Sequence, residues 1–136
     1  MQITYRDMFI VKDTLDKIWC LSLSPKLFIF LRRLAKNIEG ELKTFEPERI
    51  KLFNRHSQFD VDNMFNTPTP ETNGYNEFIT DYNDVFSSTV DIQYTNVDIE
   101  NTKTYIENSN IDIAGTIGNS LLNILEELNK LNNGSN

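Results

Sequence analysis

The sequence predicts an α+β domain: a long αα-hairpin, then a small segment of helix and strand, then a C-terminal helix. Apolar residues recur at helical spacing over residues 4–21 and 25–55, and again over 117–131. Residues 89–95 instead alternate between polar and apolar, as in a strand with one buried face. The two spacings together predict helices and strands in one chain.

The length of 136 residues fits one domain and leaves no room for a second of ordinary size. We expect this domain to span residues 1–131, with the helical hairpin over 1–56 and the mixed α/β part over 57–131. Residues 132–136 are expected to form a flexible tail.

The first helix is expected over residues 4–21. Thr4 followed by Asp7 resembles a capping box in which aspartate replaces glutamate. Met8, Val11 and Leu15 then recur at helical spacing. Ser22-Leu23-Ser24-Pro25 should end this helix and start the next one.

The second helix has the longest apolar stripe in the chain. Ser24 can cap it and Pro25 can occupy its first position. The stripe consists of Leu27, Leu31, Leu34, Ile38, Leu42 and Phe45. Pro47 removes a backbone hydrogen bond, so we expect a kink or break near residues 45–46, with helix resuming to about Arg55.

The second half of the chain alternates between strand and helix signals. A weak strand signal over residues 59–65 is followed by a helical stripe over 75–86, for which Asn73 is a candidate cap. Short extended pieces are expected at 103–106 and 111–113. The helix over 117–131 should end at Asn132-Asn133-Gly134.

The net charge of −7 is unevenly distributed. Residues 1–55 carry eleven Lys and Arg against seven acids, a net of +4. Residues 56–136 carry two basic residues against thirteen acids, a net of −11. Such a split indicates either two surfaces with different partners or two halves that neutralise each other.

Few residues suit catalysis or metal binding. The single cysteine, Cys20, excludes an intrachain disulfide, and with the single histidine, His56, it is the one candidate Cys–His dyad. Residues 60–63 resemble the start of a calcium loop, but Met64 and Phe65 stand where an oxygen ligand and glycine are needed. We therefore expect no catalytic residue, no cofactor and no metal.

The start of the second helix is the candidate partner-binding site. Phe28 and Phe30 make this end apolar on several sides, and basic residues follow at once. The expected partner-binding residues are Phe28, Phe30, Arg32, Arg33 and Lys36. Burial under the second half is the simpler alternative for the aromatic residues. Nucleic acid is a poor candidate partner because the net charge is −7.

No secretion signal or bilayer-spanning apolar run is visible, so we expect a soluble, intracellular protein without membrane contact. The segments ITYRDMF, LSP and LFIFLRRLAKNIEGELKTFEPERIKL resemble a family of small tailed-phage proteins of unknown function, often encoded near tail and virion-assembly genes. The resemblance covers residues 27–52 and, more loosely, 75–128. It departs at Pro47 and at His56-Ser57.

This resemblance implies a non-enzymatic phage accessory or virion-assembly protein, located in the host-cell cytoplasm or the virion. Its partner would be a phage structural protein or a host protein, and self-association through the apolar helix end is compatible with either. A second interpretation is an acidic inhibitor that occupies the basic cleft of a host nucleic-acid-processing or defence protein through residues 56–136. A small enzyme using Cys20 and His56 is a third.

Overall fold

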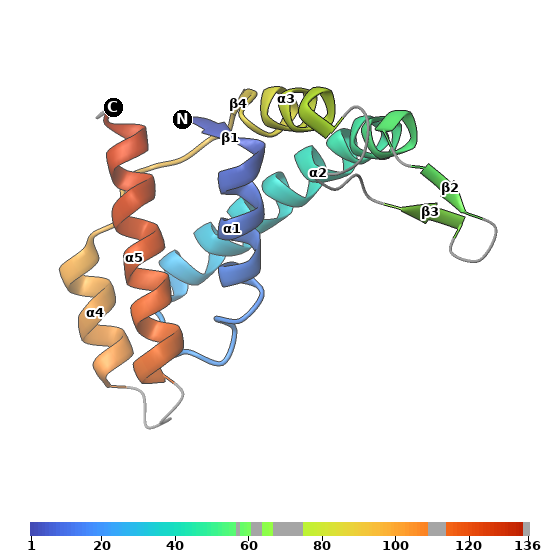
Figure 1. The fold of residues 1–136 in the computed structure, drawn as a ribbon. Helices are drawn as coiled ribbons and strands as arrows, with labels where there is room; N and C mark the ends of the chain where they lie inside the picture. The colour runs from blue at the N-terminus through green and yellow to red at the C-terminus, as the bar shows by residue number, and fades with distance from the viewer. Residues whose placement is uncertain (57, 61–63, 67–74, 109–113, 135–136) are drawn as a thin grey trace.

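The computed structural model describes residues 1–56, 58–60, 64–66, 75–108 and 114–134. Within these ranges five helices and four short strands are present, so the fold is mostly helical and is compatible with the α+β class (Figure 1). The elements, in chain order, are β1 (Gln2–Thr4), α1 (Tyr5–Leu15), α2 (Pro25–His56), β2 (Gln58–Asp60), β3 (Met64–Asn66), α3 (Tyr75–Phe86), β4 (Thr89–Asp91), α4 (Ile99–Glu107) and α5 (Ala114–Asn132).

Helix α1 starts where the capping pattern predicts and ends earlier than expected. The Asp7 N–H donates to Thr4 Oγ1 over 3.0 Å, which satisfies a backbone group that the first turn leaves unpaired. The helix ends at Leu15, although Ile18 and Leu21 are still buried. The predicted end near residue 21 is therefore wrong, because an irregular connection buries apolar residues at a similar spacing.

Helix α2 is one uninterrupted helix of 32 residues. The Leu27 N–H donates to Ser24 Oγ over 3.3 Å, so the predicted cap and the predicted start at Pro25 are confirmed. Of the kink or break expected near residues 45–46, the break is wrong, because the helix continues through Pro47. Pro47 and Lys43 both lie on the exposed side of the helix, where water can bond the carbonyl that proline leaves unpaired.

The strands form two separate two-stranded sheets. β1 pairs antiparallel with β4, and Ile3 lies opposite Val90. The strand expected over 89–95 is thus shorter, and its partner is a segment that we expected to be helical or irregular. β2 pairs antiparallel with β3, with Phe59 opposite Phe65, so the expected single strand is a hairpin instead. Residues 61–63 lie outside the described ranges.

The later helices confirm two expectations and correct one. Helix α3 has the predicted bounds, whereas its candidate cap Asn73 lies outside the described residues. Helix α5 matches the predicted C-terminal helix and ends at Asn132, two residues before Gly134 with its positive φ of 71°. The extended piece expected at 103–106 is wrong, since these residues belong to α4. The piece at 111–113 lies outside the described ranges.

The tail predicted from residue 132 is in part ordered. The Asn132 side-chain amide donates to Asn96 Oδ1, and the Asn96 amide donates to Asn133 Oδ1 over 2.8 Å. These bonds fasten the end of α5 to the segment that follows β4. Residues 135–136 are outside the described part of the chain.

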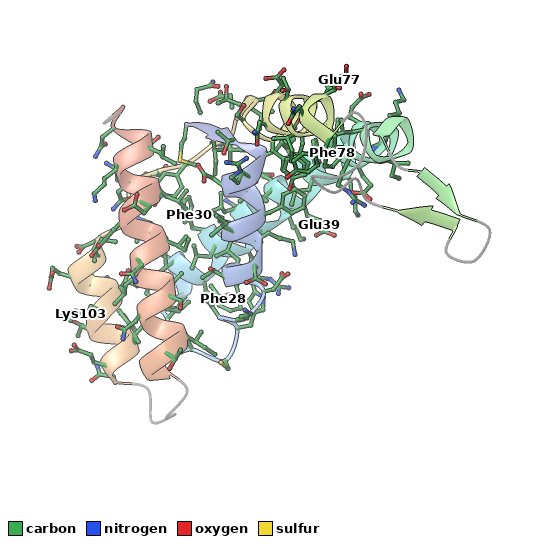
Figure 2. All side chains as sticks on the ribbon, viewed as in Figure 1. Phe28, Phe30, Glu39, Glu77, Phe78 and Lys103 are labelled. Carbon is green, nitrogen blue, oxygen red and sulfur yellow. The ribbon has the colours of Figure 1, made fainter. Side chains whose placement is uncertain are left out.

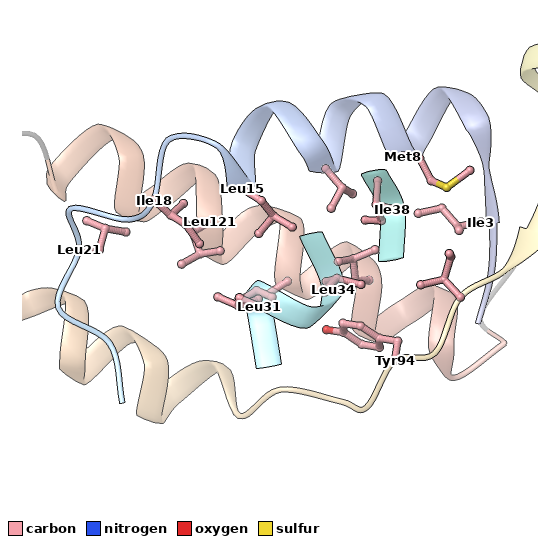
Figure 3. Close-up of a cluster of buried hydrophobic side chains, with 14 of the residues drawn as sticks. Ile3, Met8, Leu15, Ile18, Leu21, Leu31, Leu34, Ile38, Tyr94 and Leu121 are labelled. Atoms are coloured by element: carbon pink, nitrogen blue, oxygen red, sulfur yellow. The ribbon is translucent and has the colours of Figure 1, made fainter. Parts of the chain in front are cut away.

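An aliphatic core lies between α1, the first half of α2 and α5, and β4 and α4 close it (Figure 3). We use the name aliphatic core for Ile3, Met8, Val11, Leu15, Ile18, Leu21, Leu31, Leu34, Ile38, Ile92, Tyr94, Ile106, Leu121, Leu125 and Leu128, all of them buried. Helix α1 therefore packs against α2, as the hairpin prediction requires, but its 11 residues cover only part of the longer helix.

An aromatic cluster joins α3 to the middle of α2. We use this name for Tyr5, Phe9, Phe45, Phe78, Tyr82 and Phe86. The Phe86 ring lies 5.1 Å from Phe45 and 4.1 Å from Tyr82, measured between centroids, with edge-to-face and stacked geometry respectively. Such contacts contribute beyond the area that they bury. Helix α3 thus covers part of the second half of α2. The candidate site is therefore in the first half of α2.

Candidate protein-binding surface

The first turns of α2 present three sides. Leu27, Leu31 and Leu34 face the helices of the domain, and the last two are fully buried in the aliphatic core. Phe30 lies at one edge of this buried side, where its ring centroid is 5.5 Å from that of Tyr94. Phe30 is half-buried and packs against the aliphatic core. It is therefore a packing residue, on the side of the helix opposite to Arg32.

Phe28 lies at the other edge of the buried side, next to the α1–α2 connection (Figure 2). Its ring meets Trp19 edge to face at a centroid distance of 5.5 Å, yet 36% of Phe28 is exposed. The Arg32 guanidinium lies 5.2 Å from the Trp19 ring and 5.9 Å from the Phe28 ring. These cation–π contacts orient Arg32 while its charge stays in solvent.

The third side faces solvent. Ile29 is 53% exposed, and Arg32, Arg33 and Lys36 are exposed around it because residues three, four and seven positions apart share one helix face. None of these three cations forms an ion pair with a residue that the structure describes. Further along the helix, the Lys43 ammonium pairs with the Glu39 carboxylate over 3.5 Å. The group of basic side chains without a described ion pair therefore ends at Lys36.

We name Phe28, Ile29, Arg32, Arg33 and Lys36 the basic α2 surface. Four of these residues were predicted from the sequence as partner-binding residues. The fifth predicted residue, Phe30, packs against Tyr94, and Ile29 takes its place. A helical wheel could have found Ile29, because residue 29 lies one turn before residue 33 and two turns before residue 36.

A groove of about 390 Å³ lies beside Phe30, between the start of α2 and the start of α4. Most of the polar groups along it are already engaged. Asp98 caps α4 by accepting from the Asn101 N–H, and the Thr102 hydroxyl donates to the Asp98 carbonyl over 2.8 Å. Ser24 and Asn96 also form internal hydrogen bonds. The groove is a gap between capped helix ends, with few groups left to hold a ligand.

The acidic charge of α3 lies away from the basic α2 surface. Helix α3 carries Glu77, Asp81 and Asp84 and no basic residue. It packs on the far half of α2, where Asp81 and Asp84 line a small groove with Glu48 and Lys51. Glu77 lies on the outer side of α3 (Figure 2). Neutralisation of the basic α2 surface by α3 of the same chain is therefore not seen.

The arrangement brings no Cys–His dyad together. Cys20 lies in the connection that precedes α2, and His56 is the last residue of α2. A helix of this length spans about 48 Å at 1.5 Å per residue, whereas a dyad needs hydrogen-bond contact. The Cys20 thiol instead lies 3.7 Å from the Lys17 carbonyl.

The described residues contain no cluster of three or more His, Cys, Asp or Glu side chains that could hold a metal. Among the helices that the structure describes, none is long and apolar enough to cross a membrane. Comparison of the chain with protein-family models, with curated proteins and with solved structures finds no match.

Proposed function

We propose that this protein is non-enzymatic and works by binding another protein through the basic α2 surface. One observation supports this most directly: three cations that form no ion pair with a described residue surround an isoleucine that is 53% exposed. Ile29 adds to the exposed apolar area of its neighbour Phe28, and contiguous exposed apolar area with a polar rim marks protein-binding surfaces. Arginine beside apolar and aromatic side chains is typical of the residues that dominate protein interfaces.

The partner that fits this surface is acidic, with an apolar side chain to cover Ile29. An acidic surface would place carboxylates opposite Arg32, Arg33 and Lys36 and steer the approach of the two proteins. Arg32 is held by Trp19 and Phe28, so binding costs less side-chain entropy than it would for a freely moving arginine.

The setting that we propose is that of a phage accessory or virion-assembly protein, in the host cytoplasm or the virion. This part of the proposal is supported by the resemblance of residues 27–52 to small tailed-phage proteins. The partner would then be a phage structural protein or a host protein.

Charge reversal tests the surface. The tagged chain and its R32E/R33E variant are used to capture proteins from infected and uninfected bacterial lysates, with mass spectrometry as the readout. We expect at least tenfold lower recovery of the partner by R32E/R33E. The matched control is K103E/K130E, which makes the same change in charge on α4 and α5. Equal loss with both variants, or no loss with either, would contradict the proposal.

A second candidate function is inhibition of a nucleic-acid-processing host protein by the acidic half. The exposed acids Glu77 and Asp84 on a helix without basic residues favour it, because such a surface can enter a basic cleft. This function predicts that E77K/D84K weakens capture of the host protein while R32E/R33E does not. Binding should also fall steeply with added salt.

A further inference from the structure

Two helices of this chain carry net charge of opposite sign. The first turns of α2, residues 25–38, contain Lys26, Arg32, Arg33 and Lys36 and no acid, a net of +4. Helix α3 contains three acids and no base, a net of −3. Both groups of charges face solvent for the most part, so each could attract the other.

The two groups cannot meet within one copy. Asp84 lies level with Glu48 and Lys51 of α2, across the small groove that these residues line. Arg32, Arg33 and Lys36 precede that level by 12 or more residues of continuous helix, which corresponds to about 20 Å. The screening length at physiological salt is about 8 Å, so attraction across one molecule is weak. Each surface is therefore available to another molecule.

We propose that the basic α2 surface of one copy docks on α3 of a second copy. This inference rests on the proposed function, since it uses the same basic surface and names its acidic partner. The contact complements charge on both sides: Arg32, Arg33 and Lys36 on one copy meet Glu77 and Asp84 on the other. Phe28 and Ile29 contribute apolar area to the contact.

The contact joins two different patches that lie toward opposite ends of α2, so one such contact between two copies is head to tail (Figure 1). A pair of copies still presents one basic and one acidic surface. Further copies can add in the same way to give an open chain or a ring, whereas two copies that form both contacts at once give a closed dimer.

The contact is expected to be weak and sensitive to salt. Exposed ion pairs each contribute about 0.2–1 kcal/mol, and the net charge of −7 on every copy opposes association. Sedimentation velocity over a concentration series should therefore show species larger than the monomer at low salt, and these species should be lost as salt is added.

Four variants separate this contact from nonspecific charge effects. R32E/R33E should abolish self-association, and so should E77K/D84K. E77K/D84K also makes the net charge less negative. If general repulsion between copies were the only factor, E77K/D84K would therefore strengthen association. An equimolar mixture of the two variants should associate again. The chain carrying all four substitutions should also associate by itself, but more weakly than the wild type. The four substituted positions exchange charge, while residues 25–38 then have a net charge of 0 and α3 a net charge of +1. K103E/K130E should behave as the wild type.

Self-association that persists in both E77K/D84K and R32E/R33E would overturn the inference, as would a wild-type monomer at all concentrations in low salt. These outcomes do not decide the proposed function. Capture of a partner that requires Arg32 and Arg33 would still support protein binding by a monomer. A chain that self-associates through these surfaces but captures no other protein would support only the head-to-tail contact.

Discussion

The aliphatic core packs on the first half of α2 and the aromatic cluster packs around Phe45, further along the helix, and the two stabilise α2 in different ways. The aliphatic core draws on β1, α1, α2, α4, α5 and the segment after β4, so it joins the first and the last thirds of the chain. The aromatic cluster is smaller and holds one helix, α3, against α1 and α2. Phe9, a member of this cluster, is 38% exposed. We infer that the aliphatic core sets global stability and that the aromatic cluster sets the local stability of α3.

The largest expected effect is in the aliphatic core. Leu34→Ala removes a buried side chain and should lower the free energy of unfolding by about 3 kcal/mol, because the transfer energy is lost and a cavity is left. Chemical denaturation followed by circular dichroism measures this. The control Ile50→Ala, at a position 47% exposed, should change stability by less than about 0.5 kcal/mol. Similar losses in both variants would contradict the assignment of the core.

Loss of the Asn129 side-chain amide should have the next largest effect on the free energy of unfolding. Asn129 Oδ1 accepts from the Tyr94 hydroxyl over 2.7 Å and from the Val97 N–H over 3.0 Å, and its amide donates to the Val97 carbonyl. Asn129→Ala leaves these part-buried groups unpaired and should cost about 2 kcal/mol in the same assay. Asn123→Ala, on the exposed side of α5, is the matched control and should be close to neutral.

The same site predicts a dependence on pH. Burial raises the pKa of the Tyr94 hydroxyl, so the folded state favours its neutral form. The stability from Tyr94 is then complete below the unfolded-state pKa of about 10 and decreases as the pH rises above it. Ultraviolet titration should show one tyrosine that ionises last, and Tyr94→Phe should remove it. Five tyrosines that ionise together while the chain is folded would contradict this.

The aromatic cluster should respond locally. Phe86→Leu retains an apolar side chain but loses ring contacts with Phe9, Phe45 and Tyr82, a cost of about 1.5 kcal/mol. Hydrogen exchange should become faster at the amides of α3 and stay unchanged in α5. Equal acceleration in both helices would show that the aromatic cluster and the aliphatic core unfold as one unit.

The smallest effect concerns Gly40, between the parts of α2 that serve the two clusters. An added Cβ meets nothing within 4 Å, so Gly40→Ala should raise stability by about 0.8 kcal/mol through helix propensity. Gly118→Ala is the contrasting variant, because its Cβ would lie 2.6 Å from Ile106 Cγ2 and force α4 away from α5. Its melting temperature should fall while that of Gly40→Ala rises.

The helices with strong periodicity or a clear cap were the predictable part of this fold. Ser24-Pro25 located the start of α2, and the apolar stripes located α3 and α5. Helix α4 was missed because Thr102, Thr104 and Ile106 favour extended structure when taken singly. The Asp98 cap and the hydrogen bonds from the threonine hydroxyls to carbonyls four residues earlier stabilise a helix there instead.

The elements that pair with residues far away in the sequence could not be predicted from the sequence pattern. β1 is three residues long, and in its pairing with β4 Ile3 lies opposite Val90, 87 residues later, so nothing near Ile3 indicates a strand. In the candidate site, composition located the basic residues, but only the packing of Phe30 on Tyr94 showed which aromatic residue is unavailable to a partner.

The packing of α5 in the aliphatic core has a consequence for synthesis on the ribosome. Leu121, Leu125 and Leu128 cover apolar faces of α1 and α2 that leave the ribosome far earlier. While the intervening residues are being translated, those faces are in water and open to aggregation or to a chaperone. A nascent chain that stalls before residue 121 should therefore be bound by chaperones or degraded.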